Sequence, residues 1–133
     1  PFYFQAAAKA IAQMIRQTGN PHLKKIPGEA APVMDRGVII RHLVLPGCID
    51  NSLGVLDCIA DSFPKKDVLI SLMSQYVPMG KAKDIPPFDR RITEEEYAAV
   101  LSYLYLLELD HGYTQDFSAA SADYIPEFNL EGL

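Results

Sequence analysis

The 133 residues of this chain are enough for one domain with a buried core. Twelve Lys and Arg stand against seventeen Asp and Glu, and the net charge of −5 excludes the basic excess that a nucleic-acid backbone requires of its partners. The sequence has no run of about 18 apolar residues and no signal peptide, so we expect a cytoplasmic protein that does not enter a membrane.

The two cysteines are Cys48 and Cys58. They match none of the short Cys-x-x-Cys spacings that hold zinc or iron–sulfur clusters, so we predict two reduced thiols and no metal site. The chain begins at Pro1 without an initiating Met and runs directly into an alanine-rich helix. We interpret it as a piece of a longer protein.

The first predicted helix carries an apolar stripe at steps of three and four residues and ends at Gly19. The stripe consists of Ala7, Ala8, Ile11, Met14, Ile15 and Thr18. The segment 21–36 contains several prolines and no periodicity, which predicts an irregular surface connection. The run 38–45 is rich in β-branched residues and apolar on both faces, a pattern typical of a buried parallel strand.

A helix and a second strand are predicted after the first strand. The helix after the first strand is predicted to be capped by Asp50, Asn51 or Ser52 and to end before Pro64. Its stripe consists of Leu53, Leu56, Ile59, Ala60 and Phe63. The segment 68–73 predicts a second buried strand.

The last predicted helix begins with Thr93 and Glu96, the N-cap and third-position pair of a capping box. Its inner stripe consists of Tyr97, Val100, Leu101, Leu104 and Leu107. A short third strand is predicted at 113–117. The segment 118–133 is predicted to be a mostly extended tail that packs through Tyr124, Ile125, Phe128 and Leu130.

The alternation of helices and strands predicts an α/β fold with a parallel sheet and right-handed crossovers. A closed barrel of eight strands needs about 250 residues, so three strands make less than half of one. Two architectures stay open at this point. One is a small open α/β sheet, and the other is half of a barrel whose second half is missing.

Arg41 is the first candidate for a functional residue. A guanidinium inside an apolar strand has to be paired or to face a ligand, because its desolvation is otherwise costly. The same residue also fits a structural ion pair. His42 lies on the opposite face of the strand, where we expect a hydrogen-bonded histidine at the edge of the core.

Ligands of parallel sheets bind beyond the carboxyl ends of the strands, which selects the segments 46–51, 74–80 and 115–121. Ser71 and Gln75 share one face of the second strand with Met73 and fit either a ligand wall or a polar layer of the core. The loop that follows is basic and favours a solvated loop over an anion site. Its basic residues are Lys81, Lys83, Arg90 and Arg91. The chain carries no dinucleotide, phosphate-loop, serine-hydrolase or zinc-protease motif.

Four segments carry a resemblance to a known family. They are GVIIRHLVLPG at 37–47, LISLMSQYVPMG at 69–80, RRITEEEY at 90–97 and YIPEFNLEGL at 124–133. In this order they resemble the carboxyl-terminal half of radical S-adenosylmethionine (SAM) proteins related to pyruvate formate-lyase activating enzyme. The resemblance implies a partial (β/α)6 TIM-like barrel, with residues 1–133 as the carboxyl-terminal part of the radical SAM domain.

The resemblance also implies site residues. Arg41 occupies the position of an arginine that contacts SAM in the activating enzymes. Those enzymes use a histidine in a Tyr-His-x-x-Gly turn after the next strand, and Val77 stands in its place here. The contact is therefore lost or passes to Gln75 or Tyr76.

The Cys-x-x-x-Cys-x-x-Cys loop that holds the family's [4Fe-4S] cluster is missing from this chain. The resemblance therefore implies a partner, the amino-terminal half of the same protein, which completes an oxidoreductase that generates a 5′-deoxyadenosyl radical. A glycyl-radical enzyme is the implied target. The alternatives are a non-catalytic half-barrel binding or scaffold module, and a small independent α/β ligand-binding protein. An isolated piece of this kind is expected to be a homodimer or a poorly soluble monomer, because its sheet edge is open.

Overall fold

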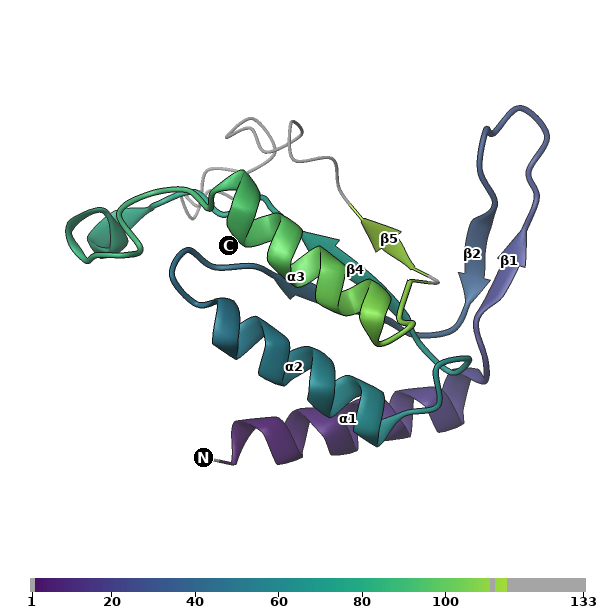
Figure 1. Ribbon diagram of the computed structural model, residues 1–133. Helices are drawn as coiled ribbons and strands as arrows, with labels where there is room; N and C mark the ends of the chain where they lie inside the picture. The colour runs from purple at the N-terminus through teal and green to yellow at the C-terminus, as the bar shows by residue number, and fades with distance from the viewer. Residues whose placement is uncertain (1, 111, 115–133) are drawn as a thin grey trace, which may run out of the picture.

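The computed structural model describes residues 2–110 and 112–114. The helices are α1 (Tyr3–Thr18), α2 (Ile49–Ser62) and α3 (Glu94–Leu106), and a short 3-10 helix, η1 (Gly80–Asp84), lies between the last two. The strands are β1 (His22–Lys24), β2 (Val33–Arg36), β3 (Ile39–Leu43), β4 (Leu69–Met73) and β5 (Tyr113–Thr114) (Figure 1).

Strands β3, β4 and β5 form one parallel sheet with β4 in the middle. Arg41 pairs in register with Ser71, and Leu43 with Met73. Helix α2 connects β3 to β4, and α3 connects β4 to β5, as the alternation of elements predicts. The parallel pairing and the connecting helices match the prediction, but the described residues as a whole form a mixed α/β fold, because an antiparallel pair of strands accompanies the parallel sheet.

The partial (β/α)6 barrel is wrong for this chain. The described residues form two separate small sheets, of which one is the parallel sheet and the other is an antiparallel pair of β1 and β2. Strands β1 and β2 pair with each other, so they add nothing to the parallel sheet. Three strands at the usual twist of roughly 20–25° per step give an open twisted sheet, and of the two architectures the open sheet is the one found.

The hairpin of β1 and β2 occupies the segment predicted to be irregular. Leu23 pairs with Met34 and Lys24 with Val33, with an irregular register beside His22. The hairpin projects from the side of the helix-and-sheet body in Figure 1. Strands of three and four residues are too short to show an alternating pattern in the sequence, which is why the prediction missed them.

The helices follow the predicted apolar stripes with small differences. Helix α1 begins four residues earlier than its stripe, and Met14 of that stripe is exposed. Helix α2 begins at Ile49 with Cys48 as its N-cap, two to four residues before the predicted capping residues. Helix α3 has the predicted capping box of Thr93 and Glu96.

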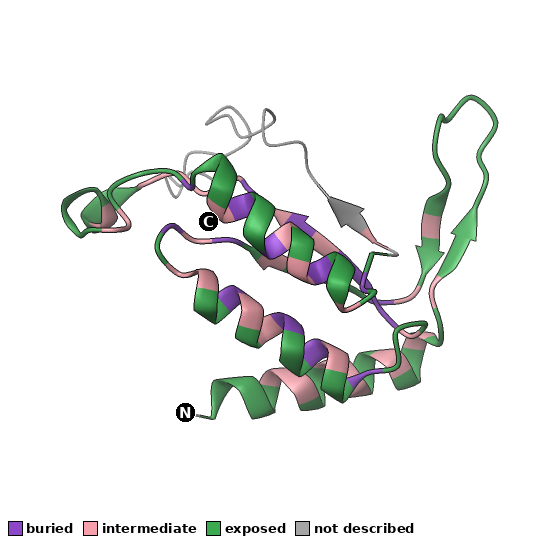
Figure 2. Ribbon diagram, viewed as in Figure 1, coloured by how far each residue is buried: buried purple, intermediate pink, exposed green. Residues whose placement is uncertain are grey.

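The core lies between the three helices and one face of the parallel sheet (Figure 2). Its fully buried side chains include Val44 and Leu72 from the sheet region, Leu56 from α2, and Val100 and Leu104 from α3. Helix α1 contributes partly buried residues. In the described part of the chain, we find no helix with the length and apolarity that crossing a bilayer requires.

Candidate functional site

Two loops leave the carboxyl edge of the parallel sheet. The first follows β3 and leads into α2, and the second follows β4 and runs through η1 to α3. Since Leu43 and Met73 are paired, both loops start at the same level of the sheet. The backbone N–H of Val44 donates to the carbonyl of Met73 over 3.0 Å and extends the pairing into the loops.

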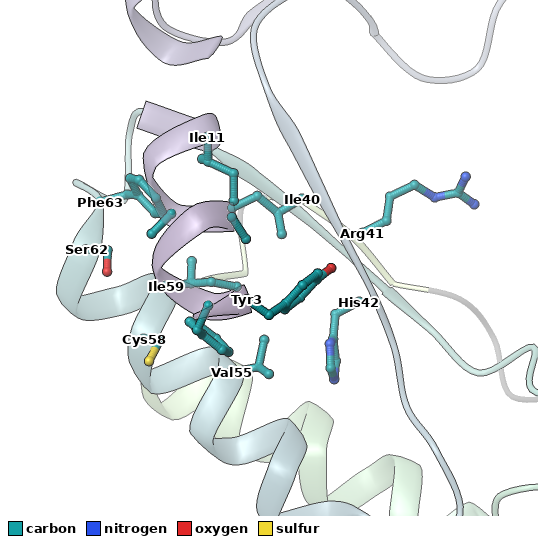
Figure 3. A pocket seen from close by; sticks show the side chains of 13 residues that line it. Tyr3, Ile11, Ile40, Arg41, His42, Val55, Cys58, Ile59, Ser62 and Phe63 are labelled. Carbon is teal, nitrogen blue, oxygen red and sulfur yellow. The ribbon is translucent and has the colours of Figure 1, made fainter. Parts of the chain in front are cut away.

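Arg41 lies in the middle of β3 on the sheet face that the helices do not cover. Figure 3 shows its side chain pointing away from α1 and α2. Its flanking residues on that face, Ile39 and Leu43, are each 37% exposed. β3 is therefore half-buried on the helix side and exposed on the other, and the expectation of burial on both faces is wrong.

The guanidinium of Arg41 is exposed, and no described residue forms a hydrogen bond or ion pair with it. The structural ion pair that the sequence left open is therefore not found in the described part of the chain. An unpaired cation on a largely apolar surface is suited to hold an anionic group of a ligand.

Gln75 and Tyr76 follow β4 at the start of the second loop, and both are half-buried. The phenol of Tyr76 donates a 2.8 Å hydrogen bond to the carbonyl of Phe88, so its hydroxyl is already used inside the loop. Arg41 is level with Ser71, and at about 3.3 Å per residue Gln75 lies on the order of 13 Å further along the strand direction. The three predicted residues share one edge of the sheet but form no contact cluster.

His42 points from β3 toward the helices, in contrast to Arg41 (Figure 3). One of its ring nitrogens, Nε2, is 2.9 Å from the hydroxyl oxygen of Ser52 in α2. Burial lowers the pKa of His42, because the charged imidazolium is poorly solvated there. The predicted hydrogen-bonded histidine at the edge of the core is confirmed.

A cavity of about 310 Å³ lies between α1, β3 and α2 on the helix side of the sheet. Its lining is mainly apolar, with Ile11, Ile40, Val55 and Ile59 among its members, and Tyr3 lies across it (Figure 3). The sequence did not point to this cavity, because it depends on how the first turns of α1 pack against α2.

The two loops at the carboxyl edge are joined by Glu96. Its Oε1 accepts a 2.9 Å hydrogen bond from the backbone N–H of Gly47 in the first loop. Arg90, in the second loop, donates to the same carboxylate. Arg90 is exposed but paired with Glu96, and Lys81 and Lys83 of the predicted basic loop are also exposed.

A [4Fe-4S] cluster does not fit the cysteines of this chain. Cys48 is the N-cap of α2 and Cys58 lies near its end, so at about 1.5 Å per residue the two are roughly 15 Å apart. Three thiolates are needed, and the sequence has two. Among the described residues, no three His, Cys, Asp or Glu side chains lie close enough together to hold a metal ion.

Several sequence predictions fall on residues that the structure does not describe. These are the last part of the third strand, the candidate segment 115–121 and the packing of the tail 118–133. The described part of the third strand, Tyr113–Thr114, pairs in parallel with β4, as expected for a parallel sheet.

Comparison with known proteins identifies a distant relative. The chain is similar to "Uncharacterized protein MJ0674" of Methanocaldococcus jannaschii, with 35% identity over 79 residues. The match covers 59% of this chain, which spans about a quarter of the relative, since the match covers 23% of its length. No known protein family matches the chain, and no solved structure matches it.

Proposed function

We propose that this chain provides a SAM-binding surface in a radical SAM protein related to the activating enzymes of glycyl-radical enzymes. The observation that carries the proposal is Arg41, an exposed guanidinium on the open sheet face with no described partner. The motifs GVIIRHLVLPG and SQYVPMG support it by resemblance, and they lie on the strand and loop that form this edge of the sheet.

Arg41 is suited to hold the carboxylate of the methionine part of SAM, since its fork of N–H donors matches a carboxylate in charge and geometry. Gln75 offers an amide for hydrogen bonds to the adenosine part. The separation along β4 requires an elongated ligand, and a nucleoside that carries an amino-acid arm has that shape. Tyr76 contributes by holding its own loop through Phe88.

In this proposal the chain is the carboxyl-terminal part of the radical SAM domain. The cysteines for a [4Fe-4S] cluster belong to an amino-terminal part of the same protein, because the two in this chain do not fit one. A glycyl-radical enzyme is the proposed target of the complete protein. We also propose a cytoplasmic location, since an exposed thiol such as Cys58 persists in a reducing compartment.

Titration of SAM into the full-length protein, under anaerobic conditions and by calorimetry, tests the proposal. Arg41→Ala is expected to weaken binding by about tenfold or more, the loss of a hydrogen bond to a charged group. The matched control is Arg36→Ala, because Arg36 is an exposed arginine at the end of β2, outside the open face. Equal affinity of wild type and Arg41→Ala, or an equal loss in both variants, contradicts the role of Arg41.

The second candidate is a non-catalytic binding module, which the count of two cysteines favours. The same titration separates the two candidates. A wild-type protein that does not bind SAM, and whose melting temperature does not change with SAM, favours the non-catalytic module.

A further inference from the structure

The carboxylate of Glu96 is used for more than the capping of α3. A capping box needs two hydrogen bonds, and both are present: Thr93 N–H to Oε2 over 2.8 Å and Glu96 N–H to Thr93 Oγ1 over 3.1 Å. The other carboxylate oxygen, Oε1, accepts from Gly47 N–H, 49 positions earlier in the chain. This bond contributes nothing to the helix and connects the loop after β3 to the loop after β4.

Arg90 provides the remaining hydrogen-bond donors to this carboxylate. Its guanidinium forks over both oxygens, with 2.8 Å from Nη2 to Oε1 and 3.0 Å from Nη1 to Oε2. A carboxylate has about four acceptor positions, so the Glu96 side chain is fully engaged. Its side chain is 16% exposed, and Arg90 shields it on the solvent side.

A second contact joins the same two loops. Gly47 has a φ of +69°, and a Cβ placed on it would lie 2.6 Å from Cγ of Pro87. The backbone of the first loop therefore lies directly against the ring of Pro87. The next residue, Phe88, accepts the hydrogen bond from the Tyr76 phenol. A continuous series of contacts leads from Gly47 through Pro87 and Phe88 to Tyr76.

We propose that Glu96 is a positioning residue that fixes the loop after β3 to the loop after β4 and so sets the ligand-binding edge between Arg41 and Gln75. The inference rests on the proposed function, since it assigns Glu96 to the same SAM site. Glu96 itself does not touch the ligand. It acts through Gly47 and Arg90, and its loss lets the two loops separate while the sheet beneath them stays paired.

Two readouts on the full-length protein test this inference. The first is hydrogen exchange of the Gly47 amide, and the second is the Kd for SAM. Glu96→Ala is expected to speed Gly47 exchange and to raise the Kd, each by about tenfold, as for the loss of one charge-assisted hydrogen bond. Glu96→Gln keeps an oxygen for Gly47 and is expected to recover part of both effects.

The matched control is Thr93→Ala. It removes the hydroxyl that caps α3 but leaves the backbone N–H of Thr93 and the contacts of Glu96 with Gly47 and Arg90. We expect its Gly47 exchange and Kd to stay within about twofold of wild type, because the loss falls on the helix end alone. If Thr93→Ala weakens SAM binding as much as Glu96→Ala, then Glu96 is only a helix cap and the inference is overturned.

The two proposals fail in different ways. Unchanged Gly47 exchange in Glu96→Ala overturns the positioning role of Glu96, whatever the SAM titration gives. A wild-type protein that binds no SAM, with Gly47 exchange faster in Glu96→Ala, overturns the proposed function. In that case the bond between the loops is upheld and its assignment to a SAM site is overturned.

Discussion

The phenol of Tyr103 in α3 donates a hydrogen bond of 2.5 Å to Oδ1 of Asp57 in α2. The bond links the two helices that connect consecutive strands of the parallel sheet. It raises the pKa of Tyr103, since the hydrogen bond holds the phenol proton and the negative charge of Asp57 opposes a phenolate.

A pH-dependent stability follows from the Tyr103–Asp57 pair. The pKa of Tyr103 is higher in the folded than in the unfolded chain, so its contribution is complete below the ordinary value of 10.0 and is lost as the pH rises through the folded pKa. Tyr103→Phe is expected to remove this alkaline loss and to lower the melting temperature at pH 7 by less than about 5 °C. The exposed Tyr105 of the same helix provides the control, Tyr105→Phe. Equal alkaline curves for wild type and Tyr103→Phe would contradict this assignment.

Protonation of Glu96 in acid is expected to lower the stability of the fold. The bonds from Arg90, Thr93 and Gly47 lower the pKa of Glu96 from 4.5 to about 2. Its contribution to stability is therefore complete above the unfolded value of 4.5 and is lost as the pH falls toward 2. Unfolding in urea from pH 5 to pH 2 measures this loss, and Glu96→Gln is expected to flatten the curve over that range. If the stability of Glu96→Gln falls as steeply between pH 5 and pH 2 as that of the wild type, the prediction is contradicted.

Two glycine substitutions are expected to change stability in opposite directions. Gly47→Ala adds a Cβ at positive φ and against Pro87, and we expect a loss of about 1–3 kcal/mol. Gly54→Ala adds a methyl group at an exposed position in the middle of α2, where no atom lies within 4 Å. We expect a gain in stability of about 0.5–1 kcal/mol. Urea unfolding of both variants gives the two values. A neutral Gly47→Ala would show that the first loop moves away from Pro87 at little cost.

The pair of His42 and Ser52 predicts a loss of stability in mild acid. Burial lowers the folded pKa of His42 below its ordinary value of 6.5, so its contribution is complete above 6.5 and declines as the pH falls. Ser52→Ala leaves a ring nitrogen of His42 without its hydrogen bond, and we expect a loss of about 1–2 kcal/mol at pH 7. Urea unfolding at pH 5 and pH 8 measures both effects. His42→Phe, which has no titrating group, is expected to lose the difference between the two pH values.

Local patterns in the sequence predicted the local parts of this fold. The capping box of Thr93 and Glu96 and the buried stripe of α3 depend on residues three or four positions apart, and the structure confirms them. The short strands β1 and β2 are missed because they carry no alternating pattern, and the bond of Gly47 to Glu96 joins residues that are 49 positions apart. No periodicity reports such contacts. The barrel failed because resemblance, and not the number of strands, supported it.

The candidate site shows the same division. Alternation along β3 placed Arg41 and His42 on opposite faces, and the structure confirms this. Whether Arg41 is buried or exposed could not be predicted, because this depends on whether another element covers the second face of the sheet. The use of the Tyr76 hydroxyl by Phe88 depends on the path of a long loop, for which the sequence gives no rule.

β3 is an edge strand within the described sheet, since its pairing is with β4 alone. An edge strand offers a row of backbone donors and acceptors to any extended chain that reaches it. The side chains of this strand read Ile-Ile-Arg-His-Leu, so a charge and an imidazole interrupt what is otherwise an aliphatic run. We expect Arg41 to oppose amyloid-like stacking at this edge, because a fixed positive charge on every copy repels the next. Arg41→Leu leaves His42 as the only polar side chain of this strand, and we expect it to aggregate faster than the wild type, with a higher thioflavin T fluorescence.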